Sequence, residues 1–161
     1  MARERPSSWA VETLTLDRPT LHEVGRVAAE AFFDDPFFKF LSPQDGLRRR
    51  GLHIYNRVGV ASLGDAGLVC GVRQGGQLVG VAAWIRPGRY PISASAQLRQ
   101  AAGAFRALAP RPIALVHGTM YLQAIDKAHP KETLWYLQLL VVDPVAQRGG
   151  VGAALQEHVY A

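Results

Sequence analysis

The chain has 161 residues, 48% of them hydrophobic and 19% charged, a balance that indicates one globular domain over residues 1–161. Its single cysteine, Cys70, excludes both a disulfide framework and a cysteine-based metal site. No run reaches the roughly 18 apolar residues of a membrane span, and the N-terminus lacks a signal-peptide core, so we expect a cytoplasmic protein without a membrane partner.

The N-terminal third predicts one edge strand and two helices. Apolar and polar residues alternate over 9–16, as in a half-buried strand. The run 20–23, Thr-Leu-His-Glu, is a capping-box signature and predicts a helix over 21–33. The run 42–45, Ser-Pro-Gln-Asp, predicts a second helix with proline at its first position. This helix is expected to direct four side chains inward, namely Leu47, Ile54, Tyr55 and Val58.

Two segments here allow more than one interpretation. The aromatic-rich link 34–41, which contains Phe37, Phe38 and Phe40, belongs either to the ordinary core or to a binding surface. The basic cluster Arg48-Arg49-Arg50 is the only concentration of charge in a chain with a formal net charge of +5. A solvated helix face explains the cluster better than a binding site for nucleic acid.

The middle of the chain predicts a hairpin and two helices. Strand-like runs at 68–73 and 77–85 flank Gly75-Gly76, which suits a type I′ turn because both central residues of that turn need positive φ. Helices are expected over 93–109 and 112–128, divided by a Pro-Arg-Pro run. The second helix places four apolar residues on one face, namely Ile113, Val116, Met120 and Ala124.

The most informative stretch comes near the C-terminal end. Residues 134–142 form an apolar run that is interrupted only by Gln138, which predicts a strand buried on both faces. Pro144 ends the run, and Gly149, Gly150 and Gly152 then lead into a helix. The first turn of a helix offers unpaired N–H groups and a positive dipole end, so this junction suits a phosphate. A P-loop lysine is missing, and too few residues follow for a dinucleotide-binding fingerprint.

The run 147–152, Gln-Arg-Gly-Gly-Val-Gly, after a strand that ends in Val-Asp-Pro, resembles the Gln/Arg-x-x-Gly-x-Gly/Ala motif of the GNAT superfamily of N-acetyltransferases. Residues 129–132, 135–137 and 31–36 are similar to the puromycin N-acetyltransferase-like group. The resemblance implies an α/β (α+β) fold, a mixed and mostly antiparallel sheet flanked by helices. It also implies that the C-terminal third of such a domain, with its later strands, is missing.

The resemblance further implies a site for acetyl-CoA as cosubstrate. The pyrophosphate would bind the glycine loop, and the pantetheine arm would pair with the end of the preceding strand. A backbone N–H at a strand bulge near residues 139–141 would stabilise the oxyanion. The tyrosine that usually acts as general acid has no equivalent here. The implied cofactor-binding residues are Leu140, Val141, Val142, Gln147, Arg148, Gly149, Gly150, Val151, Gly152 and Ala153.

Candidates for the remaining chemistry come from residue type and position. Glu132 and His129 precede the central strand and are candidate bases for the amine, although a surface charge and a helix-ending residue explain them as well. Phe33, Trp84 and Tyr121 would supply aromatic walls for an amine with an apolar body.

The hypothesis is an acetyl-CoA-dependent N-acetyltransferase that acts on a small-molecule amine. The alternative is a catalytically incompetent acyl-CoA-binding or interaction module. We expect no bound metal, because the histidines lack ligand spacing, and no nucleic-acid partner, because no helix-turn-helix or stacking platform occurs. The strand 134–142 has no later strand to cover its edge, so we also expect a homo-oligomer formed through that edge.

Overall fold

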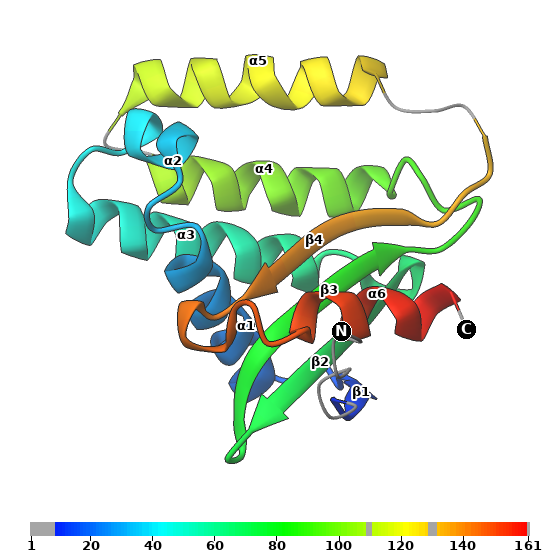
Figure 1. Ribbon diagram of the computed structural model, residues 1–161. Helices are drawn as coiled ribbons and strands as arrows, with labels where there is room; N and C mark the ends of the chain where they lie inside the picture. The colour runs from blue at the N-terminus through cyan, green and yellow to red at the C-terminus, as the bar shows by residue number, and fades with distance from the viewer. Residues whose placement is uncertain (1–8, 109–110, 129–131, 161) are drawn as a thin grey trace.

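The computed structural model describes residues 9–108, 111–128 and 132–160. A small sheet carries helices on both faces (Figure 1). In chain order the elements are β1 (Val11–Thr13), α1 (Arg18–Ala31), α2 (Pro36–Leu41), α3 (Asp45–Ala61), β2 (Gly67–Gln74), β3 (Gln77–Ile85), α4 (Ala94–Leu108), α5 (Pro112–Ala128), β4 (Tyr136–Val142) and α6 (Val151–Tyr160), with 3-10 turns at Gly64–Ala66 and Pro144–Ala146.

The strands lie in the order β1-β2-β3-β4, and each is antiparallel to its neighbours. Gly75 and Gly76 join β2 to β3 with φ values of 57° and 81°, so the hairpin prediction is confirmed. β3 is central, and every residue after Gln77 in it is buried. The predicted α/β class with a mostly antiparallel sheet is therefore also confirmed.

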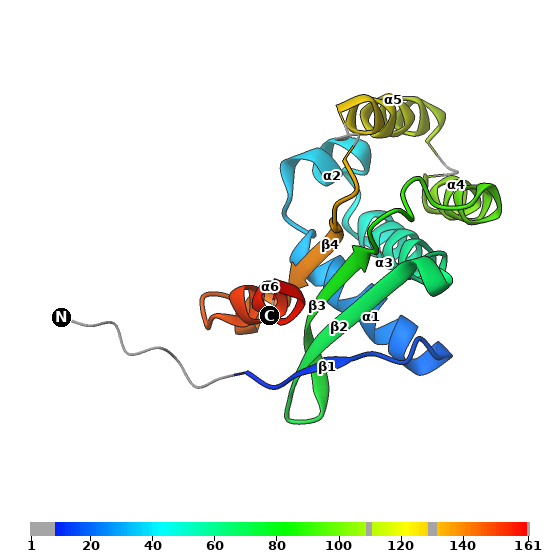
Figure 2. The same ribbon diagram turned by 90° about the vertical axis from the view of Figure 1, so that its right-hand side faces the viewer.

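The sheet separates two hydrophobic clusters. On one face, β3 and β4 pack against α1 and α3, with Val24, Val27 and Val60 in the cluster. On the other face, α6 contributes Val151 and Leu155 to a second cluster. Figure 2 shows α6 on the opposite side of the sheet from α1 and α3. β4 contributes the buried Leu139 and Val141 to the first cluster and only partly buried side chains to the second. The prediction of a strand buried on both faces is therefore confirmed for one face and in part for the other.

The capping-box prediction at Thr20 is wrong. Asp17 caps α1 instead, because its side chain accepts a hydrogen bond from the Thr20 N–H at 2.8 Å. Glu23, which would have completed the box, accepts hydrogen bonds from Arg73 and from the Leu78 N–H. The carboxylate therefore ties α1 to the hairpin and does not close a helix end.

The link over residues 34–41 contains a further helix, α2, which the sequence pattern does not predict. Asp35 caps it by accepting from the N–H groups of Phe37 and Phe38 at 2.8 and 3.3 Å, and Pro36 occupies its first position. The next helix, α3, begins only at Asp45, so Pro43 precedes it and does not open it.

The prediction that the cluster Arg48-Arg49-Arg50 forms a solvated helix face is wrong for Arg48, which is buried. Only 3% of its surface is exposed. Its guanidinium donates to the carbonyls of Phe33, Ser42 and Pro43 and pairs with Asp45. Burial of a charge is tolerable when it is fully paired, so Arg48 fastens the start of α3 to the turn around α2.

The side chains of α3 differ from the prediction in one further respect. Leu47 is exposed, and Leu52 is the leucine of this helix that is buried. Two glycines then bring α4 close to α3. A Cβ at Gly51 would lie 3.1 Å from the Ala107 carbonyl oxygen, and one at Gly103 would lie 2.8 Å from the Val58 side chain.

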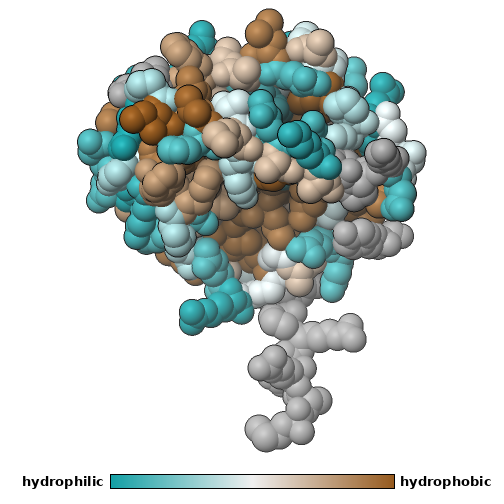
Figure 3. Space-filling model, turned by 90° about the horizontal axis from the view of Figure 1, so that it is seen from above, coloured by the Kyte–Doolittle hydropathy of each residue, from teal (hydrophilic) through white to brown (hydrophobic). Residues whose placement is uncertain are grey.

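The main contacts of α5 are with α2 and α4. Its predicted apolar face does exist, but it points outward, since Ile113, Val116 and Met120 are exposed. Figure 3 shows apolar side chains on this side of the molecule, beside a hollow with an apolar floor. No helix in the described part of the chain is long and apolar enough to cross a membrane.

Candidate functional site

The junction between β4 and α6 is held from two sides. Asp143, at the end of β4, is buried, donates its N–H to the Val79 carbonyl at 2.8 Å and caps the 3-10 turn through the Val145 N–H. Its carboxylate pairs with Arg26 of α1 at 2.9 Å, and Arg26 also donates to the Leu78 carbonyl. The start of the glycine loop is therefore fixed to both α1 and β3.

The loop itself has a left-handed turn at two positions, with φ values of 64° at Arg148 and 84° at Gly150. Trp9, 140 residues away in sequence, donates its indole N–H to the Gly149 carbonyl at 2.7 Å. Gln147 donates its side-chain amide to the Val142 carbonyl at 3.1 Å. Both bonds are accepted by carbonyl oxygens, so neither of them occupies a backbone N–H group of the loop.

The helix that follows leaves its first amides available to a ligand. The Ala154 N–H bonds to the Gly150 carbonyl at 3.0 Å, which makes it the first helical donor of α6. The N–H groups of Val151, Gly152 and Ala153 precede it and have no partner within the helix. A Cβ at Gly152 would meet only the Val142 side chain, at 3.9 Å. The protein itself therefore does not need a glycine there, whereas an approaching phosphate would benefit from one.

The outer edge of β4 lies beside this loop. The Asp143 N–H bonds inward to β3, and backbone direction alternates along an antiparallel strand. Val141 consequently also directs its N–H and C=O to β3, opposite Val81, whereas Leu140 and Val142 direct theirs outward. Of the three residues predicted to pair with a pantetheine arm, only Leu140 and Val142 therefore have outward backbone groups.

β4 contains the expected bulge, one residue before the stretch 139–141 near which it was predicted. Ala83 pairs with Leu139 while Trp84 pairs with Leu137, so Gln138 is the extra residue. Residues 139–141 themselves are regular strand. The side-chain oxygen of Gln138 is buried and has no hydrogen-bond partner among the described residues.

The sequence-based substrate residues do not come together. Trp84 is 1% exposed and lies in the cluster beneath α6, on the opposite face of the sheet from α1 and α3. The ring of Phe33 lies against the guanidinium groups of Arg48 and Arg49, each 4.3 Å from its centroid. Only Tyr121 faces a cavity.

The two candidate bases stay predictions. Glu132 is exposed in the segment that precedes β4, and His129 lies outside the described residues. The part of the chain that the structure describes contains no group of three or more histidine, cysteine or acidic residues able to hold a metal.

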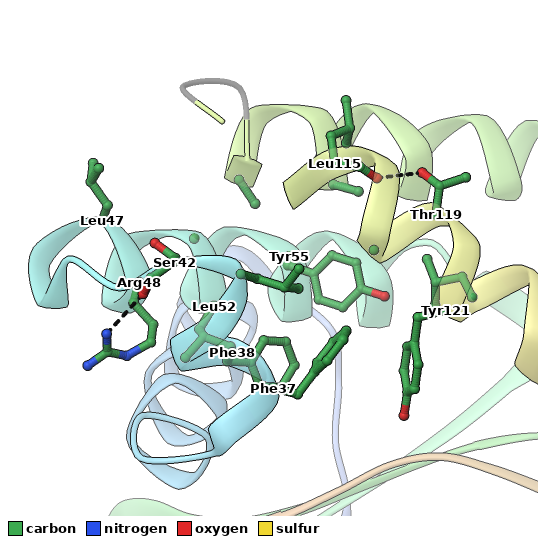
Figure 4. A pocket seen from close by; sticks show the side chains of 16 residues that line it. Phe37, Phe38, Ser42, Leu47, Arg48, Leu52, Tyr55, Leu115, Thr119 and Tyr121 are labelled. Carbon is green, nitrogen blue, oxygen red and sulfur yellow. Dashed lines mark hydrogen bonds between the residues drawn. The ribbon is translucent and has the colours of Figure 1, made fainter. Parts of the chain in front are cut away.

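The cavity beside Tyr121 has a volume of about 120 Å³ and lies among α2, α3, α4 and α5. Phe37 and Phe38 from α2, Leu52 and Tyr55 from α3 and Tyr121 from α5 line it (Figure 4). The rings of Phe37 and Tyr121 lie 4.4 Å apart and close it between α2 and α5. The sequence signal for this cavity is the aromatic-rich link 34–41, which is predicted to belong either to the ordinary core or to a binding surface.

A group of tyrosines adjoins the cavity. Tyr136, the first residue of β4, lies 5.3 Å from the ring of Tyr90, whose hydroxyl donates to Asp126 of α5 at 2.5 Å. Burial, followed by the nearby phenols of Tyr136 and Tyr121, raises the pKa of Tyr55. Burial, followed by Asp126 and Tyr121, raises the pKa of Tyr136. Tyr55 and Tyr136 therefore keep their phenol protons at neutral pH, and Tyr136 lies within electrostatic reach of Asp126.

The sheet, its flanking helices and the strand–glycine loop–helix junction define a fold of the GNAT acetyltransferase type. No protein-family model and no curated protein matches the chain. A solved structure from Corynebacterium glutamicum, described as histone acetyltransferase HPA2 and related acetyltransferase, matches with a TM-score of 0.63 and 26% identity. The match covers 95% of this chain and 70% of that one. The comparison supports a transferase of acyl groups, in agreement with the motif.

Proposed function

We propose that the chain is an N-acetyltransferase that uses acetyl-CoA to acetylate the primary amine of a small molecule, with the puromycin N-acetyltransferase-like group as the expected subgroup. The observation that carries the proposal is the start of α6. Three consecutive amides without helical partners follow a loop that Trp9, Arg26 and Gln147 hold in place. A prepositioned anion site of this kind suits the pyrophosphate of CoA.

The outer edge of β4 also suits the pantetheine arm of acetyl-CoA. The Val142 carbonyl already accepts the Gln147 side-chain amide. The outward N–H and C=O of Leu140 and the outward N–H of Val142 can hydrogen-bond an extended amide-containing chain as an added strand would. The N–H groups of residues 151–153 would hold the phosphates, and the exposed Arg148 side chain adds a positive charge. Bound acetyl-CoA would supply the activated acetyl group, and these residues would fix its orientation. Holding two reactants in register is worth roughly 7–11 kcal/mol of the barrier.

The transfer breaks the acetyl C–S bond and forms a C–N bond. The protonated amine loses one proton before it attacks and a second as the amide forms, and the leaving thiolate takes up one of them. An amine with a pKa near 10.4 is deprotonated at pH 7 at a cost of about 4.6 kcal/mol. Glu132 and His129 remain the sequence-based candidates for the base that accepts the first proton.

Gly152→Val tests the phosphate site. Valine at the second position of α6 should lower CoA affinity at least tenfold, about 1.4 kcal/mol, because its branches occupy the space in front of the free amides. Gly46→Val is the matched control, since Gly46 is the second residue of α3 and has nothing within 4 Å of its Cβ position. Calorimetry of CoA binding should show the loss in the first variant alone.

Release of free CoA thiol from acetyl-CoA in the presence of an amine panel tests the reaction itself. Thiol release that depends on an amine supports an acetyltransferase. Tight CoA binding without any amine-dependent release would instead favour the non-catalytic acyl-CoA-binding module. Equal CoA affinities in wild type, Gly152→Val and Gly46→Val would contradict the placement of the cofactor.

A further inference from the structure

The inward face of α5 combines an apolar stretch with one carboxylate. Leu115, Thr119 and Leu122 line the cavity. Asp126 follows Leu122 by four residues, so it lies on the same face one turn later. Its bond to the Tyr90 hydroxyl confirms that it points back toward the body of the molecule. The cavity therefore has a negative charge next to its apolar wall.

Aromatic rings surround the space between that charge and β4. The rings of Tyr90 and Tyr136 lie 5.3 Å apart, and Tyr121 reaches in from α5 (Figure 4). The faces of these aromatic rings attract a cation. A carboxylate next to several such faces is a favourable environment for an ammonium group.

The lining of the cavity disfavours a ligand that carries a second charged group. Its one basic lining residue, Arg48, already donates to three carbonyls and pairs with Asp45. The remaining lining is aliphatic and aromatic apart from the hydroxyls of Ser42, Tyr55, Thr119 and Tyr121. A second charged group placed here would lose its hydration without gaining an oppositely charged partner. Apolar cavities of roughly 150 Å³ accept a benzene ring.

We propose that the acceptor is a primary amine joined by a short linker to an aromatic or branched aliphatic body, with the body in this cavity and the ammonium group between Asp126 and Tyr136. The inference rests on the proposed function and specifies its substrate class. Tyr136 begins β4 two residues before the bulge at Gln138, so an amine held there lies beside the strand expected to carry the acyl arm.

Two variants separate recognition of the body from recognition of the charge. Ala104→Phe places a ring in the cavity from α4, and Ala101→Phe, at an exposed position of the same helix, is its control. Asp126→Asn removes the charge but keeps an oxygen for Tyr90, and Glu157→Gln on the exposed side of α6 is its control. The probes are 2-phenylethylamine and its neutral analogue 2-phenylethanol, with binding measured by calorimetry in the absence of CoA.

We expect wild type to bind both probes and to acetylate 2-phenylethylamine with a higher kcat/KM than spermidine. Ala104→Phe should weaken both probes at least tenfold. Asp126→Asn should weaken the amine at least threefold and leave the alcohol unchanged, a difference that a purely structural role of Asp126 would not produce. CoA affinity should be the same in all variants.

Three results would overturn the inference: no binding of either probe to wild type, equal loss of amine and alcohol in Asp126→Asn, or preferential acetylation of spermidine. In the last case the proposed function still holds. Conversely, if both probes bind as expected while acetyl-CoA does not, the acetyltransferase proposal fails and the cavity remains an amine site.

Discussion

His53 lies where α3 packs against α1. Its ring is 4.6 Å from that of His22, and its Nε2 atom is buried without a hydrogen-bond partner among the described residues. Gly25 makes room for it, because a Cβ there would lie 2.8 Å from the His53 side chain. Burial, followed by the charges of His22 and Arg57, lowers the pKa of His53. The folded protein therefore favours the neutral imidazole.

This shift predicts a loss of stability in mild acid. The unfolded chain binds a proton at His53 once the pH falls below about 6.5, whereas the folded chain resists protonation until a lower pH. The free energy of unfolding should therefore be unaffected by this group above that pH and should decrease as the pH falls below it. Urea unfolding at about pH 5, 6 and 7.5 would measure this, and His53→Gln should flatten the dependence.

His158→Gln, at an exposed position on α6, is the control for that series. It should leave the pH dependence as in wild type. If His53→Gln and wild type lose stability in parallel between pH 7.5 and 5, other groups cause the acid sensitivity.

At the scale of elements, one residue fixes the distance between α6 and the sheet. A Cβ at Gly80 in β3 would lie 2.4 Å from Val151 Cγ1 and 3.1 Å from Leu155 Cδ1. Val151 begins the helix whose amides form the proposed phosphate site. The close contact of α6 with β3 thus positions both the second hydrophobic cluster and the site.

Gly80→Ala should consequently destabilise the fold and weaken the ligand together. Overpacking of a filled core costs about 1–3 kcal/mol, and the displaced α6 should lower CoA affinity as well. Urea unfolding and calorimetry measure the two effects. Gly59→Ala is the control, because nothing lies within 4 Å of that Cβ position in α3, and alanine there should be neutral or slightly stabilising. Unchanged CoA affinity in a destabilised Gly80→Ala would show that the site tolerates movement of α6.

Local patterns were sufficient for most elements. The hairpin, the strand through Leu139 and the division between α4 and α5 follow from turn chemistry and periodicity along a continuous stretch. The helix α2 was missed because six residues carry too little periodicity, although its cap, Asp35, and first residue, Pro36, were visible. The helix start was predicted three residues too late, because both Asp17 and Thr20 are possible N-caps. Asp17 is the actual cap, and Glu23 bonds to the Leu78 N–H of β3, so it cannot complete a capping box with Thr20.

The candidate site likewise has one part that the sequence predicts and one part that it does not. The glycine loop is contiguous, so its residues could be named from the sequence. The cavity is not contiguous, since it needs Phe37, Tyr55, Ala104 and Tyr121 from four helices whose relative placement no local pattern encodes. Trp84 shows the opposite error, because an aromatic residue near the expected site proved to face the other side of the sheet.

For the whole molecule, the outer edge of β4 matters most. Within the described residues β4 pairs with β3 alone, so the backbone groups of Leu140 and Val142 face outward. The expectation of a homo-oligomer through this edge stays a prediction, and the structure adds a condition to it. The same groups cannot bind a neighbouring strand and an extended cofactor arm at once.

Association and CoA should therefore compete. Sedimentation velocity should show a concentration-dependent dimer without ligand and a shift toward monomer at saturating CoA, as mass action requires. Adenosine 3′,5′-bisphosphate is the control ligand, because it carries phosphates without the arm and should leave the dimer intact. A monomer at all concentrations would exclude pairing through β4.

The bond from Trp9 to Gly149 also has a bearing on the order of folding. It joins residues 140 positions apart, and ordering a loop of that length has an entropic cost that only a largely assembled molecule can offset. Contacts of such long range generally form late. During folding, the hairpin of β2 and β3 can appear early, whereas the glycine loop acquires its shape only after the first strand and α6 have both docked. Competence to bind CoA should therefore arise in the final kinetic phase, after most of the secondary structure is present.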